Sequence, residues 1–360
     1  MSQNSEFLAR VLRNGARSFA AYASGELLDT HAQAAKGLGP NPLAAWQSCL
    51  AARVEELAAA VAAEQPRLFT TQVNWAKTVL AARGISAEHF RAGVEILGNV
   101  LAKELPAAVQ PLASDYVDKA IESFDEQPAE LSARLQPNTT HGQLASTYLL
   151  ALLEGDRRRA SRVILDAIDQ PDSVRDIYLH VLMPAQAELG RMWLTGEINV
   201  AEEHFASHTT KMVMSQLLTK ASLRPPNGKT MLTASVAGNR HDIGLHAVAD
   251  FFEMAGWRTI QLGADVPIDD LVQAVECFDV DLLAISASLN VQLETVKSTI
   301  RAVRSGKRGD AVKILAGGLA FADSSDLAVE MGADAYAADA DEAVRLGGQL
   351  VGLTPNPGDE

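Results

Sequence analysis

The C-terminal third of the chain alternates short apolar runs with segments of helical periodicity, and this alternation constrains the fold more than any other feature. The apolar runs are Lys229–Val236, Trp257–Leu262, Leu282–Ala287 and Val312–Leu315, and the helical segments are Asp242–Ala255, Ile268–Cys277, Val291–Val303 and Ser325–Met331. Strands that alternate with helices pair in parallel, and their crossover helices cover both faces of the sheet. We therefore expect a Rossmann-like α/β domain over residues 228–353.

Three polar or glycine-rich segments lie at the ends of strands in this expected sheet. Asn239–Gly244 follows the first apolar run, Ser286–Asn290 overlaps the end of the third, and Gly317–Gly318 follows the fourth. Ligands of open parallel sheets bind outside the carboxyl ends of the strands. The sequence therefore predicts that these three segments contribute to one binding site.

The spacing of the three segments resembles the signature of base-off/His-on cobalamin-binding domains, in which Asp-x-His-x-x-Gly precedes Ser-x-Leu and then Gly-Gly. Here Asn239-Arg240-His241-Asp242-Ile243-Gly244 is followed after 41 residues by Ser286-Ala287-Ser288, and after 28 more by Gly317-Gly318. Each piece alone is an ordinary loop or turn. Their order and their positions at strand ends carry the resemblance.

The resemblance implies that His241 is the lower axial ligand of cobalt, a metal that imidazole suits. It also implies that the nucleotide tail of the corrinoid passes Ser286 and Ser288, where the two glycines leave room for it. The cofactor-binding residues expected here are Asn239, His241, Asp242, Ile243, Gly244, Ser286, Ser288, Asn290, Gly317 and Gly318.

Two residues depart from the family pattern: Asn239 stands in place of Asp, and Ser288 in place of Leu. A metal-ligating histidine normally donates its other ring proton to a neighbouring acceptor, which makes the imidazole a stronger donor. An amide can accept this bond but carries no charge. We therefore expect His241 to donate less electron density than in the family.

Residues 138–222 are expected to form an all-helical domain, with helices over Gly142–Glu154, Arg157–Ile168, Val174–Leu194 and Val200–Leu218. Short connections between four helices favour a four-helix bundle, and Asn199 with Glu202 forms a capping pair before the last helix. A bundle ahead of a cobalamin-binding domain resembles the cap that shields the upper face of the corrin in corrinoid proteins.

Trp193, followed after nine residues by Glu203-His204, resembles the Trp-x9-Glu-His signature of light-sensing cobalamin photoreceptors. That resemblance implies adenosylcobalamin as cofactor, with Trp193, Glu203 and His204 around the adenosyl group. Light would cleave the Co–C bond and change assembly or partner binding. Leu194 replaces the histidine that the photoreceptors have there, and His208 on the face of His204 is the candidate substitute.

Residues 1–135 are rich in Ala and Leu, and their periodicity predicts helices over Phe7–Ser24, Leu43–Ala63, Thr71–Ala82, Ala87–Leu101 and Tyr116–Phe124. A helical domain at this position resembles the photocobilins, which bind biliverdin beside the corrinoid. The residues that would line a tetrapyrrole pocket are Trp46, Cys49, Trp75, His89, Phe90, Arg91 and Tyr116. A docking or dimerisation domain with aromatic residues in its core is an equal alternative. Glu126–Thr140 is the expected linker to the next domain.

Composition narrows the choice of partners. The net charge of −14 argues against direct binding to nucleic acid or anionic membrane. Two cysteines exclude a disulfide scaffold and a zinc site. We find no signal peptide and no apolar run that could span a bilayer, and so expect a soluble cytoplasmic protein.

Three functions remain open at this stage. The leading expectation is a non-catalytic photoreceptor that forms a light-dependent homo-oligomer and signals through a downstream protein. The second is a corrinoid shuttle protein of a methyltransferase system, favoured by the shared cobalamin motif and disfavoured by the Trp-x9-Glu-His pattern and the N-terminal domain. The third is a cobalamin-sensing antirepressor.

Overall fold

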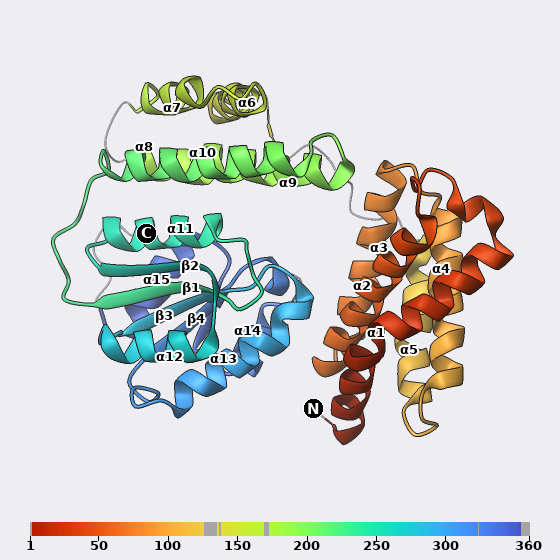
Figure 1. Ribbon diagram of the computed structural model, residues 1–360. Helices are drawn as coiled ribbons and strands as arrows, with labels where there is room; N and C mark the ends of the chain where they lie inside the picture. Colours follow the sequence, from red (N-terminus) through yellow and green to blue (C-terminus); the bar gives the residue numbers. More distant parts are fainter. Residues whose placement is uncertain (1, 126–134, 137, 169–172, 323, 354–360) are drawn as a thin grey trace. The chain divides into compact units, whose positions relative to one another are not determined.

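The computed structural model describes residues 2–125, 135–136, 138–168, 173–322 and 324–353 (Figure 1). These fall into two compact units: unit 1 is Met1–Ser132 with Leu194–Gly196, and unit 2 is Ala133–Trp193 with Glu197–Glu360. The expected linker Glu126–Thr140 lies largely outside the described residues. The three-domain division expected from the sequence stays a prediction.

Unit 1 is helical, as the periodicity of its sequence predicts. Its elements are α1 (Gln3–Thr30), η1 (Ala32–Ala35), α2 (Pro42–Ala62), α3 (Pro66–Ala82), α4 (Ala87–Glu104), α5 (Gln110–Glu122) and η2 (Ser123–Asp125). Prolines occupy the first turns of α2, α3 and α5, where the fixed φ suits a helix and the missing N–H has no intrahelical acceptor to lose. Two long helices, α1 and α2, pack against each other along the unit.

Three aromatic residues expected to line a tetrapyrrole pocket lie in the core of unit 1. Trp46, Phe90 and Tyr116 are at most 4% exposed, and the Nε1–H of Trp46 donates to the carbonyl oxygen of Ala34 at 3.0 Å. Arg91 forms ion pairs with Glu95 and Asp125. Cys49 and His89 are half-buried, and Trp75 is exposed. The buried aromatics agree with the alternative that they pack the core of this domain.

Unit 2 begins with a helical layer, which comprises α6 (Thr140–Leu153), α7 (Arg157–Leu165), α8 (Ser173–Ile177), the π-helical turn η3 (Tyr178–Leu182), α9 (Met183–Thr195) and α10 (Val200–Leu218). The predicted capping pair is confirmed: the Asn199 side chain accepts from the amide of Glu202, and the Glu202 carboxylate accepts from the amide of Asn199. The layer packs through apolar side chains, most of which are fully buried. Whether it serves as a cofactor cap stays a prediction.

The rest of unit 2 is an α/β domain built on five parallel strands in the order β2-β1-β3-β4-β5. The strands are β1 (Thr230–Val236), β2 (Arg258–Val266), β3 (Leu282–Ser286), β4 (Lys313–Gly317) and β5 (Ala335–Ala337). The helices are α11 (Ile243–Met254), α12 (Ile268–Cys277), η4 (Asn290–Gln292), α13 (Leu293–Ser305), η5 (Leu319–Phe321), α14 (Asp326–Glu330) and α15 (Ala340–Leu350). The expected doubly wound sheet is confirmed, whereas β5 and α15 were not predicted from the sequence.

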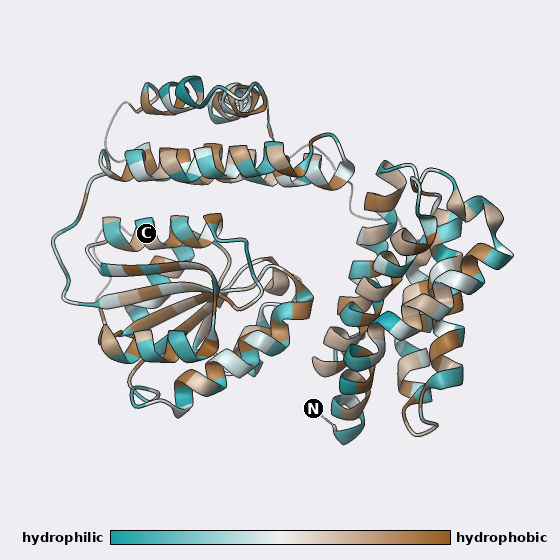
Figure 2. Ribbon diagram, in the orientation of Figure 1, coloured by the Kyte–Doolittle hydropathy of each residue, from teal (hydrophilic) through white to brown (hydrophobic). Residues whose placement is uncertain are grey.

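The hydropathy of the α/β domain follows its layers. Every residue of the inner strand β1 is buried, whereas the edge strand β2 is partly exposed. In Figure 2 the inner strands are largely hydrophobic, and the flanking helices carry one apolar and one polar face. Helices α11 and α15 cover one face of the sheet, and α12 and α13 cover the other (Figure 1). Within the described residues, no helix has both the length and the apolarity needed to cross a membrane.

The helical layer packs on α11 mainly through apolar side chains, and one buried polar contact lies among them. Phe251 of α11 belongs to the hydrophobic cluster of the layer. The Tyr178 hydroxyl lies 2.7 Å from Asp250 Oδ2 and 3.0 Å from the carbonyl oxygen of Met214. Burial raises the pKa of Asp250 to about 7. A phenol has one proton, so only a protonated Asp250 lets both contacts be hydrogen bonds at once.

Replacing Asp250 with Asn should remove a pH dependence of stability. The carboxyl keeps its proton in the folded state up to about pH 7, whereas the unfolded chain loses it near the ordinary value of 3.8. Its contribution is therefore fully present below about pH 4 and is lost progressively as pH rises from there to about 7. Between about pH 5.5 and about pH 8, the wild type should lose roughly 2 kcal/mol more stability than Asp250→Asn, at about 1.36 kcal/mol per pKa unit.

Urea unfolding at a series of pH values measures this difference. Asp176→Asn is the control, because Asp176 is an exposed carboxylate of α8. Parallel stability curves for wild type and Asp250→Asn across this range would show that Asp250 is ionised in the folded protein.

Candidate functional site

The order of the strands places a binding edge between β1 and β3. The chain leaves β1 toward β2 on one side of the sheet and leaves β3 toward β4 on the other, so the two loops diverge at this point. Such a switch point is where open α/β sheets bind ligands. Asn239 and His241 follow β1, and Ser286 ends β3 directly opposite Gly317 of β4. The structure therefore brings the three predicted segments to one edge.

Asn239 holds the loop after β1 against the end of β3. Its side chain is fully buried. The Nδ2–H group donates to the carbonyl oxygen of Ser286 at 3.0 Å, and Oδ1 accepts from the amide of His241 at 3.1 Å. A carboxylate could not donate the first of these bonds. The Asn that departs from the family pattern thus has a structural reason to be an amide.

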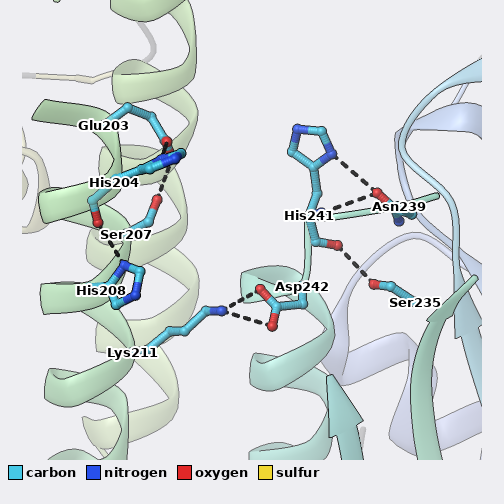
Figure 3. A network of polar contacts seen from close by, with 9 residues as sticks. All are labelled: Glu203, His204, Ser207, His208, Lys211, Ser235, Asn239, His241 and Asp242. Atoms are coloured by element: carbon cyan, nitrogen blue, oxygen red, sulfur yellow. Dashed lines mark hydrogen bonds and ion pairs between the residues drawn. The ribbon is translucent and has the colours of Figure 1, made fainter. Parts of the chain in front are cut away.

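The same side chain fixes the tautomer of His241. Because Nδ2 faces the Ser286 carbonyl, the oxygen of Asn239 faces the imidazole, and it lies 3.1 Å from Nδ1. The Nδ1 atom must then carry the ring proton, which leaves a lone pair on Nε2. The residue is exposed, and the ring points away from the loop (Figure 3). His241 is thus oriented as metal-ligating histidines are.

Three further polar residues anchor this loop, and none of them was predicted from the sequence. The Ser235 hydroxyl donates to the carbonyl oxygen of His241 at 2.9 Å. Asp265 Oδ1 accepts from the amide of Gly238 at 2.6 Å. Gln292 bridges the two loops, because its Nε2 donates to the Gly238 carbonyl while its Oε1 accepts from the amides of Ser288 and Leu289. The loop is therefore held in place before any ligand binds.

The sheet face beneath His241 combines small residues with a buried polar atom that has no partner. Thr233, Ser286 and Gly317 each lie two residues beyond a strand residue that packs in the cluster of α11, so they share that face. Among the described residues, the fully buried Oγ1 of Thr233 makes no hydrogen bond. A buried hydroxyl normally has a partner. The face therefore fits a polar ligand segment such as the nucleotide tail of a corrinoid.

The two glycines at the end of β4 also suit the protein's own backbone, and Gly318 is required by it. Gly318 has φ +99°, and a Cβ there would lie 2.2 Å from the carbonyl oxygen of Ala287. A Cβ on Gly317 would lie 3.0 Å from the carbonyl oxygen of Ala337. Their expected role of leaving room for the tail stays a prediction. Gly244 differs, because a Cβ there would meet nothing within 4 Å.

Helix α10 presents a polar stripe opposite the His241 loop, which we define as Glu203, His204, Ser207, His208 and Lys211 (Figure 3). Glu203 accepts from the Ser207 hydroxyl and lies 2.7 Å from Nδ1 of His204. Nδ1 of His208 lies 2.9 Å from the carbonyl oxygen of His204, so it carries the ring proton there. The predicted pair Glu203-His204 thus lies on the side of the helical layer that faces the predicted cobalt ligand.

Of the other predicted residues, Asp242, Ile243 and Asn290 belong to this edge, whereas Trp193 belongs to the helical layer. Asp242 pairs with Lys211 of the stripe at 2.6 Å. Ile243 packs against the cluster of the helical layer, and Asn290 begins η4 and is 8% exposed. Trp193 lies near the end of α9 and is 40% exposed. Lys211 was not predicted from the sequence, although it lies one helical turn beyond His208.

Comparison with known proteins identifies two matching domain families. A family model described as a B12 binding domain matches residues 229–345, and a second model with the same description matches residues 144–218. The first covers the α/β domain with its binding edge, and the second covers most of the helical layer. Residues 1–132 lie outside both matches.

Similar proteins are corrinoid proteins. A corrinoid protein of Desulfitobacterium hafniense is 26% identical over 206 residues, which are 56% of this chain and 94% of that protein. Dimethylamine corrinoid protein 3 of Methanosarcina mazei is 30% identical over 34% of this chain and 71% of that protein. The match to the dimethylamine corrinoid protein of Methanosarcina barkeri spans 56% of that relative.

A solved structure shares the fold of this region. The monomethylamine corrinoid protein of Methanosarcina barkeri superposes with a TM-score of 0.51 at 21% identity, over 59% of this chain and all of that one. At this identity the likeness shows the fold alone.

The expectation of a light-sensing photoreceptor is wrong. The relatives are corrinoid proteins, some of them named for dimethylamine, and they agree with the shuttle alternative instead. Light-dependent assembly, adenosyl binding and a bilin rested on the photoreceptor reading, and none of them has support from these relatives. The Trp-x9-Glu-His pattern misled because Trp193 and Glu203-His204 sit on helices that a corrinoid protein also has.

Replacing His241 with Ala should remove the protein ligand of a bound corrinoid. The absorption bands of cobalamin mixed with the variant should match those of the free cofactor, and affinity should fall by at least about tenfold, because a metal–nitrogen bond is lost. His89→Ala, in unit 1, is the control for loss of an imidazole. Wild-type bands and affinity in His241→Ala would exclude His241 as the ligand.

Replacing Asn239 with Asp should destabilise the protein. The carboxylate would face the Ser286 carbonyl without a proton to donate, and a buried unpaired group costs about 1–3 kcal/mol. The deficit should shrink in acid, where a protonated carboxyl can donate again. Asn199→Asp is the control, because a carboxylate can cap α10 equally well. Equal urea midpoints for the wild type and Asn239→Asp would refute the clamping role of Asn239.

Proposed function

Because the chain belongs to the family of B12-binding corrinoid proteins, we propose that it binds a corrinoid and carries a methyl group between methyltransferases. The arrangement of His241 is the observation that carries the proposal. Its Nδ1 proton is committed to Asn239, and its Nε2 lone pair is exposed at the switch point of the sheet. One imidazole suffices as a protein ligand, because the corrin ring supplies the equatorial nitrogens.

The bound corrinoid supplies the chemistry, because its reduced cobalt is a nucleophile that can take up a methyl group and release it to another nucleophile. The residues of this chain bind and tune the cofactor. His241 would hold the cobalt, and the face with Thr233 and Ser286 would receive the nucleotide tail. The methyl group itself needs no specific contact, because it is small and apolar.

The imidazole of His241 faces an amide oxygen where the family pattern has a carboxylate, and this difference would tune a bound corrinoid. An imidazole that donates to an amide is a weaker electron donor than one that donates to a carboxylate. A weaker axial donor favours the lower oxidation states of the metal. With a corrinoid bound, Asn239 would therefore favour the reduced cobalt more than an Asp at this position would.

The partners in this proposal are two methyltransferases, one that loads the methyl group and one that removes it. Catalysis belongs to those enzymes, and this chain acts as their shared substrate. The names of the relatives point to methylated amines as the class of methyl donor. Unit 1 lies outside the family matches, and we assign it to docking rather than to cofactor binding.

Methyl transfer with isolated components tests the proposal. The chain loaded with hydroxocobalamin and reduced by titanium(III) citrate should take up one labelled methyl group from methyl iodide. A purified thiol methyltransferase that uses methylated corrinoid proteins should then remove it at least about tenfold faster than from the same concentration of free methylated cofactor, or about 1.4 kcal/mol of protein recognition. Loaded chain that takes up no label, or that reacts no faster than free cofactor, would contradict the proposal.

A further inference from the structure

The polar stripe of α10 makes one ion pair with the loop that carries His241. Nζ of Lys211 lies 2.6 Å from Oδ1 and 2.8 Å from Oδ2 of Asp242, so it binds both oxygens (Figure 3). Asp242 is the residue directly after His241. The contact therefore connects the helical layer to the backbone of the cobalt ligand.

Asp242 has a second set of donors within reach. It occupies the N-cap position of α11, where an Asp side chain usually accepts from amides of the first turn. Its side chain makes no such bond here, because both oxygens face Lys211. If the helical layer moved away, the carboxylate could rotate to cap its own helix, where the helix dipole also favours a negative charge. Breaking the ion pair is therefore offset by a new interaction.

The pair is partly buried, and the titratable side chain of His246 interacts with both of its members. The side chains of Lys211 and Asp242 are 38% and 13% exposed. His246, one turn into α11, is half-buried, and burial together with the Lys211 charge lowers its pKa. A neutral His246 does not compete with Lys211 for Asp242. The ion pair should therefore be sensitive to salt, because solvent and counterions reach Lys211.

We propose that Lys211 is a positioning residue that closes the helical layer over His241 through Asp242, and that Asp242 alternates between Lys211 in the closed state and the first turn of α11 in the open state. The proposal rests on the proposed function, because a methyltransferase must reach the upper face of a corrinoid held by His241. Two states with different partners for one carboxylate give a population that a docking enzyme can shift.

Exchange of the upper cobalt ligand measures how often the layer opens. Protein loaded with aquocobalamin is mixed with N-methylimidazole at about pH 8, where this ligand is neutral, and the absorption change gives the exchange rate. A neutral probe is needed because removal of the Lys211 charge would alter the approach of an anion. Lys211→Met and Asp242→Asn should each raise the rate about two- to fivefold, the effect of losing one partly exposed ion pair.

The double variant separates the ion pair from unrelated effects. Lys211→Met with Asp242→Asn should be no faster than the faster single variant, because either change alone removes the same contact. Lys211→Arg should restore the wild-type rate. Raising salt from about 0.05 M to about 0.5 M should accelerate the wild type and leave the single variants unchanged. Lys229→Met is the matched control, because Lys229 pairs with Asp281 at the opposite end of β1 with similar exposure.

Three outcomes would overturn the proposal: unchanged exchange in both single variants, additive acceleration in the double variant, or equal acceleration by Lys229→Met. Failure of the wild type to bind aquocobalamin would appear in the spectrum before any exchange is measured, and it would remove the proposed function as well. Normal loading with unaltered exchange would remove only the role of Lys211.

Discussion

The side-chain amide of Asn239 is the contact on which the proposed site depends. One end donates to the backbone of β3, and the other accepts from both nitrogens of His241 that face it. The first bond orients the second, since an amide has a donor end and an acceptor end. The hydrogen bond from Asn239 to β3 therefore determines which nitrogen of His241 carries the proton and which is free to bind cobalt. The binding edge is therefore a property of the sheet as a whole.

The helical layer and the α/β domain meet through contacts of two kinds. Apolar residues such as Phe251 provide the larger buried surface. Polar contacts also join the two surfaces: Tyr178 with Asp250 in the interior, Lys211 with Asp242 at the edge beside His241, and Arg175 with Asp341 of α15. The interior contact involves a carboxyl whose pKa burial raises to about 7. The contact of Lys211 with Asp242 is accessible to solvent and lies beside His241, so a partner protein that approaches the cofactor site can exchange it for its own contacts.

The sequence predicted those elements whose apolar pattern extends over enough residues to show a period, and it predicted the site where the motif segments have a fixed spacing. The first four strands and the helix Ile268–Cys277 lie where the apolar runs placed them, and the cobalamin motif fell at the strand ends. Strand β5 was missed because its three residues, Ala335–Ala337, are too short to show a period. Helix α3 begins at Pro66 rather than at the predicted Thr71, because a proline fits the first turn of a helix. Lys211 and Gln292 could not be predicted, because their partners lie 31 and 54 residues away in sequence.

The light-sensing function was predicted wrongly for another reason. The short Trp-x9-Glu-His motif, which lies on two helices, was given more weight than the cofactor domain that the chain shares with other corrinoid proteins.

The central claim is that Nε2 of His241 binds the cobalt of a corrinoid, and electron paramagnetic resonance tests it most directly. Protein with 15N-labelled histidine is loaded with unlabelled cobalamin and reduced to the cobalt(II) state. The nitrogen splitting on the cobalt lines should change from the triplets of 14N to the doublets of 15N, because the axial nitrogen comes from the protein. Triplets that persist in the labelled protein would place the cofactor's own base on the cobalt, and the account of this site would be wrong.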